Sequence, residues 1–325
     1  WVPPGPHGQQ HWASQGHPAC GGQSQSPIDI RTRGARPDPS LPPIRAVGQP
    51  ETPTLTLRNN GHTAMLALPP SLRIQGLPHS FAAAQLHFHW GGTGSTGGAE
   101  HLLDGHRAPA EMHVVHYDAD LYADAGEAQH HAGGLAVLGV LLEVRAPQNK
   151  PPRVRAPHPD PFPPQVGADP HPAYDNVLRH LGSIRYAGQT TAIPSFSIGA
   201  LLPPRLDLFY RYNGSLTTPP CYQSVLWTLF QQPVRISQAQ LEQLQGALYS
   251  TTAAEPQPRR LVDNFRAPQE LNQRLVLSGF VPPPCPPLEP SGASPAGEIV
   301  AIVLGTVAGC LGLLLAGHFV AKRMR

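Results

Sequence analysis

The chain has 325 residues, of which 41 are proline and 32 glycine, and this content excludes a helical bundle or coiled coil because proline breaks helix interiors. Hydrophobic residues make up 40% and charged residues 14%, a balance that excludes wholesale disorder. Residues 1–298 carry 20 basic and 21 acidic side chains, so the chain lacks a basic face and we expect no nucleic-acid partner.

Short runs of alternating apolar and polar residues, bounded by Gly, Pro and Asn, predict β-strands along most of the chain. Only 174–181 and 237–248 have the pattern of helices, and Ser237 is a suitable N-cap for the second. The sequence therefore predicts a mainly β (α+β) fold, a single domain around a large, mostly antiparallel twisted central sheet with few short helices. The predicted strands are 54–58, 63–68, 85–90, 112–117, 135–144, 207–212 and 224–230.

The C-terminal end has the pattern of a membrane anchor. Residues 282–297 have the Pro- and Gly-rich composition of a stalk, and 298–320 contain an uncharged run long enough to span a bilayer. The basic residues of 321–325 indicate a cytoplasmic tail. We therefore expect a type I single-pass protein of the plasma membrane, with the lipid bilayer as a partner and 1–281 as an extracellular domain. The alternative for the apolar run is a buried core helix.

Three further features bear on this organisation. Gly305 and Gly309 form a G-x-x-x-G pattern, which predicts weak self-association in the membrane. The chain opens at Trp1 with no apolar leader, so we expect a signal peptide to be already absent. A Pro-rich stretch at about 146–168 predicts an atypical insert or long loop inside the domain.

Four cysteines allow three full pairings, and an extracellular location permits disulfides. Cys285 lies in the predicted stalk and Cys310 in the predicted span. Cys20 and Cys221 therefore remain as the expected pair within the folded domain, and two free buried thiols are the alternative.

Two predicted strands carry histidines in a pattern typical of a metal site. Alternation places Gln85, His87 and His89 on one face of the first strand, and Glu111 and His113 on one face of the second. If the strands are neighbours, three imidazoles converge and leave a fourth tetrahedral position open, as in catalytic zinc sites. Gln85 and Glu111 are suitable acceptors for the second ring nitrogens. The alternative is a set of ordinary surface histidines.

Two further segments indicate a function only when they are considered together with these strands. Asn59–His62 is a turn ending in a histidine, and Ser215–Pro220 places two threonines before a di-proline. Together, and in this order, the segments resemble the α-class carbonic anhydrases, in particular their single-pass extracellular members, over nearly all of residues 5–280. The resemblance rests on Ser26–Ile30, Asn59–His62, His87–Trp90, Glu100–His101, Glu111–His113, Ser215–Pro220, Asn264–Arg266 and Leu271–Arg274.

This resemblance implies a zinc lyase, carbonate dehydratase (EC 4.2.1.1), that hydrates CO2 reversibly to bicarbonate and a proton through attack by zinc hydroxide. It implies one Zn²⁺ per chain on the three histidines, supported by Gln85, Glu111 and the backbone carbonyl of Asn264. Thr217 would accept the hydrogen bond of the hydroxide and donate its own to Glu100, and His62 would move the proton to buffer. The remaining implied substrate contacts are Val115, Val137, Leu216, Thr218 and Trp227.

The resemblance also implies that a Cys20–Cys221 bridge braces the Thr217 loop, and Asn213 begins a glycosylation sequon. The chain departs from the family pattern at Pro3 and Met65, which bear on proton transfer, and at Ala99 and Ala108, which bear on packing. The alternative function is a weak or inactive carbonic anhydrase-like ectodomain that acts as a binding or adhesion module.

Overall fold

The computed structural model describes residues 8–144, 169–281 and 322–323. The chain divides into two units, Trp1–Pro282 and Pro283–Arg325, and in the second only Lys322 and Arg323 are described, both helical. Pro3, the predicted insert, the stalk and the predicted span at 298–320 lie outside the described residues. Among the residues described, no helix is both long enough and apolar enough to cross a membrane.

The first unit is mainly β, as predicted. Its strands are β1 (Asp29–Ile30), β2 (Arg36–Pro37), β3 (Arg45–Val47), β4 (Thr54–Asn59), β5 (Ala64–Ala67), β6 (Arg73–Gln75), β7 (Phe81–Trp90), β8 (Leu102–Leu103), β9 (His106–Arg107), β10 (Ala110–Asp118), β11 (Leu135–Val144), β12 (Thr190–Pro194), β13 (Phe209–Gly214), β14 (Val225–Phe230), β15 (Val234–Ile236) and β16 (Leu277–Ser278).

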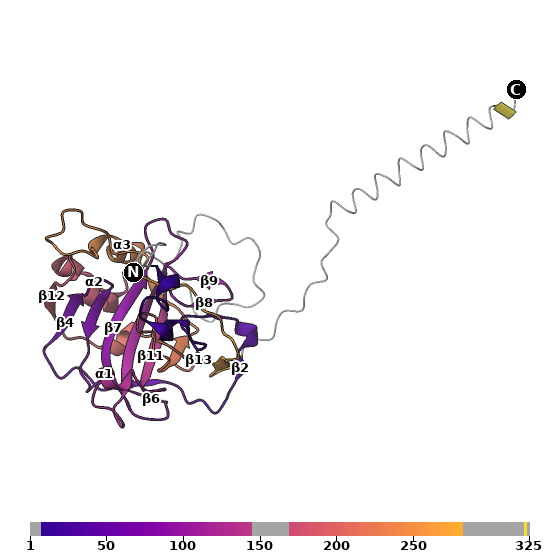
Figure 1. Cartoon of the computed structure of the whole chain (residues 1–325), viewed down its shortest axis with the longest axis horizontal. Helices are drawn as coiled ribbons and strands as arrows, with labels where there is room; N and C mark the ends of the chain where they lie inside the picture. Colours follow the sequence, from indigo (N-terminus) through magenta and orange to yellow (C-terminus); the bar gives the residue numbers. More distant parts are fainter. Residues whose placement is uncertain (1–7, 145–168, 282–321, 324–325) are drawn as a thin grey trace. The chain divides into compact units, whose positions relative to one another are not determined.

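One large mixed sheet organises this unit. Its order is β12-β4-β5-β7-β10-β11-β14-β13-β16-β2, and β12, β4, β7, β11 and β13 can be followed across Figure 1. Most neighbours are antiparallel, but β14 and β15 pair with β11 in parallel, and β16 pairs with β2 in parallel. A second, small sheet joins β1, β8 and β9.

The strand patterns follow from position in the sheet. The side chains of β4, near one end of the order, alternate between exposed and buried, because that strand has one solvent face. The eight residues that begin the central strand β11 are all buried, which explains their nearly continuous apolar sequence. The predicted strand 135–144 is confirmed in full, whereas β7 and β10 extend beyond 85–90 and 112–117.

Three α-helices, α1 (Ala125–Ala128), α2 (Pro172–Leu178) and α3 (Gln238–Ala247), are described alongside the strands. α2 and α3 confirm the predicted helices at 174–181 and 237–248. α2 ends at Leu178, before the predicted end, and a 3-10 turn follows at Leu181–Ile184. The Ser237 hydroxyl accepts a hydrogen bond from the Gln240 N–H and completes a capping box, which fixes where α3 begins.

The core has two parts because the strand side chains alternate. Leu86, Phe88, Met112 and Val114 belong to the larger part, which also contains apolar side chains of α2 and α3. The odd-numbered neighbours of these residues face the other way, and Val115 contributes there to a smaller apolar cluster. His87, His89 and His113 lie on this second face, whereas His116, which follows a bulge in β10, lies among residues of the larger part.

Candidate metal centre

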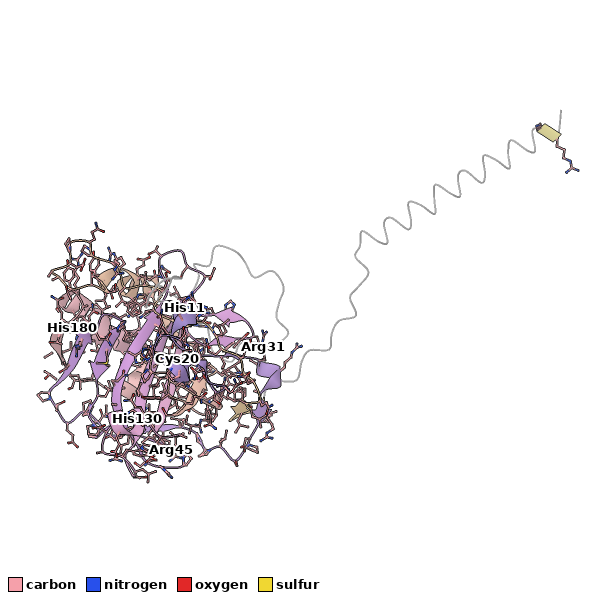
Figure 2. The ribbon with its side chains drawn as sticks, viewed as in Figure 1. His11, Cys20, Arg31, Arg45, His130 and His180 are labelled. Atoms are coloured by element: carbon pink, nitrogen blue, oxygen red, sulfur yellow. A yellow bond between two sulfur atoms is a disulfide. The ribbon has the colours of Figure 1, made fainter. Side chains whose placement is uncertain are left out.

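Three predicted ligands are brought together by strand pairing. In the antiparallel register of β7 and β10, His113 lies directly opposite His87, and Glu111 lies opposite His89. The three imidazole centroids are 4.5 to 5.2 Å apart, and one ring nitrogen of each lies within 4.8 Å of the other two. Other histidines of the chain lie outside this group, including His11, His130 and His180, which Figure 2 labels.

Each of the three rings has one nitrogen committed to an acceptor. His87 Nδ1 lies 2.8 Å from Gln85 Oε1, and His89 Nδ1 lies 2.6 Å from the Asn264 carbonyl oxygen. His113 Nε2 lies 2.7 Å from Glu111 Oε1. Because an amide or carboxylate oxygen can only accept there, each of these ring nitrogens donates and carries the hydrogen.

The remaining nitrogens are therefore unprotonated in neutral rings and face one another. His89 Nε2 and His113 Nδ1 lie 3.1 Å apart, with a lone pair on each. Two facing acceptors at that distance repel each other unless a cation lies between them. Burial lowers the pKa of His113, and that of His89 to about 4, which keeps the rings neutral. The residues present thus fit a cation with nitrogen ligands.

Glu100 places a carboxylate beside these nitrogens. Its Oε1 accepts a hydrogen bond of 2.8 Å from the Arg266 N–H, and its Oε2 lies 3.5 Å from His89 Nε2. Burial raises the pKa of Glu100 to about 7, and the Thr217 hydroxyl acts in the opposite direction. Oε2 is buried, makes no hydrogen bond of ordinary geometry with a described residue, and lies 3.5 and 3.9 Å from His89 Nε2 and His113 Nδ1.

Glu111 is the most heavily bonded acceptor of the site. Its Oε2 accepts the N–H groups of Glu100 and His101, each at 2.8 Å, and its Oε1 lies 2.8 Å from His101 Nδ1. His101 Nε2 in turn lies 2.7 Å from the Tyr212 hydroxyl. Complete burial acts to raise the pKa of Glu111, but electrostatic attraction to His101 and His113, together with their hydrogen bonds, holds that pKa well below its usual value. The sequence predicted Glu111, but its link to Tyr212 was missed.

A cavity of about 410 Å³ opens onto the centre and is lined by His87, His89, His62, Thr218 and Met65 among others. Its volume suits a small-molecule site. Two predicted residues, His62 and Thr218, therefore share a cavity with two of the predicted ligands. Met65, one of the departures from the family pattern, lies in the same wall.

His62 is held at this cavity by its backbone. The turn before it is fixed by Asn60, whose Oδ1 accepts the N–H groups of His62 and Thr63 at 2.9 Å, and by Gly61, whose φ of +86° strongly favours glycine. Asn264 Nδ2 donates to the His62 carbonyl at 2.9 Å. His62 as a whole is exposed, but partial burial of its imidazole in the cavity wall lowers the pKa of the ring.

The predicted apolar contacts form a row across three strands. Val115 of β10 pairs with Val137 of β11, which pairs with Trp227 of β14, and Leu216 packs against the same cluster. The Trp227 and His113 rings are 4.8 Å apart, so the row borders the histidines. These four side chains are absent from the lining of the 410 Å³ cavity, which Thr218 does reach.

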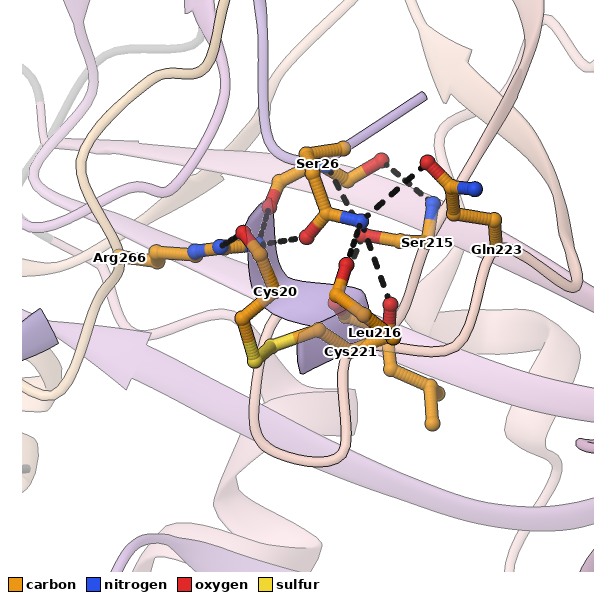
Figure 3. Close-up of a disulfide and its surroundings, with 9 residues drawn as sticks. Cys20, Ser26, Ser215, Leu216, Cys221, Gln223 and Arg266 are labelled. Carbon is orange, nitrogen blue, oxygen red and sulfur yellow. Dashed lines mark hydrogen bonds between the residues drawn. A yellow bond between two sulfur atoms is a disulfide. The ribbon is translucent and has the colours of Figure 1, made fainter. Parts of the chain in front are cut away.

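The segment that carries Thr217 is tied to the N-terminal part of the domain. The Cys20–Cys221 disulfide joins residues 201 positions apart, which confirms the predicted pair, and Figure 3 shows its surroundings. The Arg266 guanidinium donates to the carbonyl oxygens of Cys20 and Ser26 at 3.0 and 2.9 Å. Ser26 and Ser215 also exchange hydrogen bonds, N–H to hydroxyl in both directions.

Arg266 connects the disulfide to Glu100, and no local pattern in the sequence indicates this connection. Its guanidinium donates a hydrogen bond to the Cys20 carbonyl, next to the disulfide, and its backbone N–H donates one to the Glu100 carboxylate. The only sequence signal was its place in the Asn264–Arg266 motif that supported the family resemblance.

Taken together, these features define a mainly β protein with three imidazoles arranged so that they could hold a metal ion. The chain belongs to the eukaryotic-type carbonic anhydrase family, whose sequence pattern matches residues 7–159 and 161–280.

Individual relatives support this membership. The chain is 42% identical to carbonic anhydrase 12 of Homo sapiens over 282 residues, which cover 86% of this chain and 73% of the relative. It is 38% identical to carbonic anhydrase 6 of Bos taurus, with 85% and 79% covered, and 34% identical to carbonic anhydrase 6 of Homo sapiens, with 84% and 80% covered. The predicted enzyme class, carbonate dehydratase, is thereby confirmed at the level of the family.

Proposed function

We propose that the chain hydrates CO2 reversibly to bicarbonate and a proton, with one zinc ion per chain held by His87 Nε2, His89 Nε2 and His113 Nδ1. The main support for the proposal is the set of three facing nitrogens, each unprotonated because the other nitrogen of its ring donates to an acceptor. When bound, zinc acts as a Lewis acid that makes a water-derived nucleophile available near neutral pH, a property already established for carbonic anhydrases.

Gln85, Glu111 and the Asn264 carbonyl set the tautomer and orientation of the three ligand rings. Because all three acceptors lie in or against the sheet, the facing nitrogens would keep their spacing when a ligand enters or leaves. This preorganisation avoids a reorganisation cost during the reaction.

Thr217 and Glu100 are proposed to orient the attacking water. The Glu100 carboxylate is fixed by the Arg266 N–H, and Thr217 lies close enough to affect the pKa of that carboxyl. A threonine that donates its hydroxyl proton to Glu100 can only accept a hydrogen bond from the nucleophile, which fixes the direction of the lone pair that attacks.

The substrate would lie between the ligands and the apolar row of Val115, Val137, Leu216 and Trp227. Such walls favour an uncharged, apolar molecule such as CO2 over bulk water. Thr218, at the cavity, would contact bicarbonate. His62 would accept the product proton on its imidazole and release it to buffer, because its lowered pKa leaves it neutral at pH 7.

We further propose that residues 1–281 act outside the cell, carried by the stalk at 282–297, the membrane helix at 298–320 and the tail at 321–325, with an N-linked glycan at Asn213. The disulfide supports an oxidising compartment, and the one-sided basic charge after the apolar run supports the orientation. Contact of Gly305 and Gly309 between two copies would add weak self-association.

The proposed reaction is tested on the purified full chain by zinc analysis together with stopped-flow CO2 hydration. We expect one zinc per chain and rapid hydration that a chelator removes and added zinc restores. A zinc-free, inactive chain would contradict the proposal and favour the binding-module alternative.

A further inference from the structure

A second cavity, of about 570 Å³, lies beside β13 and β14, and its lining contains none of the three metal-site histidines. Trp227 of β14 borders the centre, whereas its neighbour Leu226 lines this second cavity together with Arg211 and Tyr212 of β13. We call it the arginine cavity, because its lining includes three guanidinium groups and no carboxylate. These are Arg36, Arg211 and Arg274.

Arg211 is the most unusual of the three. It is only 5% exposed, and within the described part of the chain its one hydrogen bond to a side chain runs from Nε to Thr228 Oγ1 at 3.0 Å. Its Nη2 is buried with no hydrogen-bond partner among the described residues. Phe209 covers one face of the guanidinium at 4.9 Å. A buried cation with an unmet donor and no counter-charge is costly unless a ligand completes it.

The other two arginines add further positive charge to the cavity. Arg274 donates from Nη1 to the Asn213 carbonyl at 3.1 Å and from Nη2 to the Glu270 carbonyl at 2.8 Å, so it has acceptors but no anion. Arg36 is exposed and forms no ion pair with a described residue under ordinary criteria. It is near enough to Asp38 to lower the pKa of that carboxyl, but Asp38 is bonded mainly to Ser40.

The strand register sets the spacing of these charges. Arg36 of β2 pairs with Leu277 of β16, which pairs with Arg211 of β13. An apolar side chain thus separates two guanidinium groups in one row, and Leu226 continues the apolar surface. Guanidinium groups match carboxylates with two parallel hydrogen bonds, while the leucines match an apolar body.

We propose that the arginine cavity binds a small organic carboxylate that carries an apolar group, at a site separate from the catalytic centre. The volume lies in the range of small-molecule sites, and the charge is complementary to one anion rather than to a neutral ligand. Nothing in the hydration of CO2 uses this face of β13.

The proposal is tested by calorimetric titration of the full chain with 2-naphthoate and, as the neutral counterpart, 2-naphthamide. Production in a bacterial periplasm forms the disulfide and leaves the Asn213 sequon, which lies at the same cavity, without a glycan. We expect the carboxylate to bind at least about tenfold more tightly than the amide, because charge-assisted hydrogen bonds contribute that much.

Variants separate this cavity from other anion sites. Arg211→Gln and Arg36→Gln should each weaken 2-naphthoate binding by about tenfold. Both variants are needed, because the substitution at the buried Arg211 can impair folding whereas Arg36 is exposed. Arg235→Gln, at an exposed arginine of β15 outside the cavity, should leave binding unchanged. Equal binding of the acid and the amide, or binding unaffected by Arg36→Gln in a folded protein, would overturn the proposal.

Discussion

The three histidines of the proposed metal site, His87, His89 and His113, are positioned by different means from the loop at residues 215–221 beside them. The histidines are placed by a regular ladder in which His113 lies opposite His87. The loop has no such ladder and depends on the Cys20–Cys221 disulfide and on Arg266. The spacing of the three histidines is therefore set by main-chain pairing, whereas the geometry around Thr217 depends on side chains distant in sequence.

The largest effect is expected from His113→Ala, which removes a ligand from the ladder itself. Two imidazoles should not retain zinc at stoichiometric level, and CO2 hydration should fall to the buffer background. Metal analysis and stopped-flow hydration measure both quantities. His106→Ala, at an exposed histidine of β9, is the matched control and should behave as wild type. Zinc retained with full turnover would refute the assignment of His113.

The double variant Cys20→Ser, Cys221→Ser removes the brace of the loop and leaves the ladder intact. For a bridge over 201 positions, we expect the free energy of unfolding to fall by about 2–5 kcal/mol. Zinc should still bind while kcat/KM for hydration decreases, because only the loop is loosened. Chemical denaturation and metal analysis test this. If a folded double variant lost both its zinc and its hydration activity, the two regions would not be independent.

Gln85→Ala probes the support of a ligand within the ladder. Removal of the acceptor of His87 Nδ1 should weaken zinc affinity by about 10–100-fold, since such partners fix the ligand tautomer. Competition with a metal chelator gives the affinity. Gln238→Ala, on the exposed side of α3, serves as the control. An unchanged affinity would mean that the strand alone orients His87.

His62→Ala tests a loop-borne group that does not hold the metal. Turnover should fall several-fold at low buffer concentration, and added imidazole should restore part of it, because an external base replaces the missing imidazole. Zinc content should not change. If added imidazole gave no rescue, His62 would not be the residue that moves the proton.

The smallest effect concerns a pair outside the site. The exposed imidazole of His79 bonds to the buried carboxylate of Asp118, and this bond raises the pKa of His79. The contribution of the pair to stability is therefore fully present below pH 6.5 and is lost as the pH rises through the raised pKa. His79→Gln should destabilise the domain more at pH 5.5 than at pH 9, as denaturation at both values would show. Equal losses would contradict a charged pair.

The sequence predicted the two histidine-bearing strands because the signals are local, whereas their pairing entered only as a condition that the structure meets. His87, His89, Gln85, Glu111 and His113 lie in two strands whose alternation is visible within a few residues. The strand 135–144 was located in full for the same reason, since a buried central strand has a continuous apolar run.

Long-range side-chain contacts were less accessible to sequence reasoning. Arg266 bonds to Cys20 across 246 positions, and no local pattern at either residue indicates the other. The short strands β1, β2, β8, β9 and β16, each of two residues, were not predicted because they are too short for alternation to appear. The arginine cavity also depends on the register of β2, β16 and β13, which only the fold provides.

The late position of Asn264 in the chain has a consequence for biosynthesis. Its carbonyl holds His89, while its amide donates to the carbonyls of His62 and Phe88. A nascent chain that has presented β7 and β10 to the folding compartment still lacks this residue, about 150 positions downstream of β10. The centre can therefore be completed only when synthesis of the domain is nearly finished. A truncated translation product that ends before Asn264 would carry all three histidines and yet lack the acceptor that orients His89.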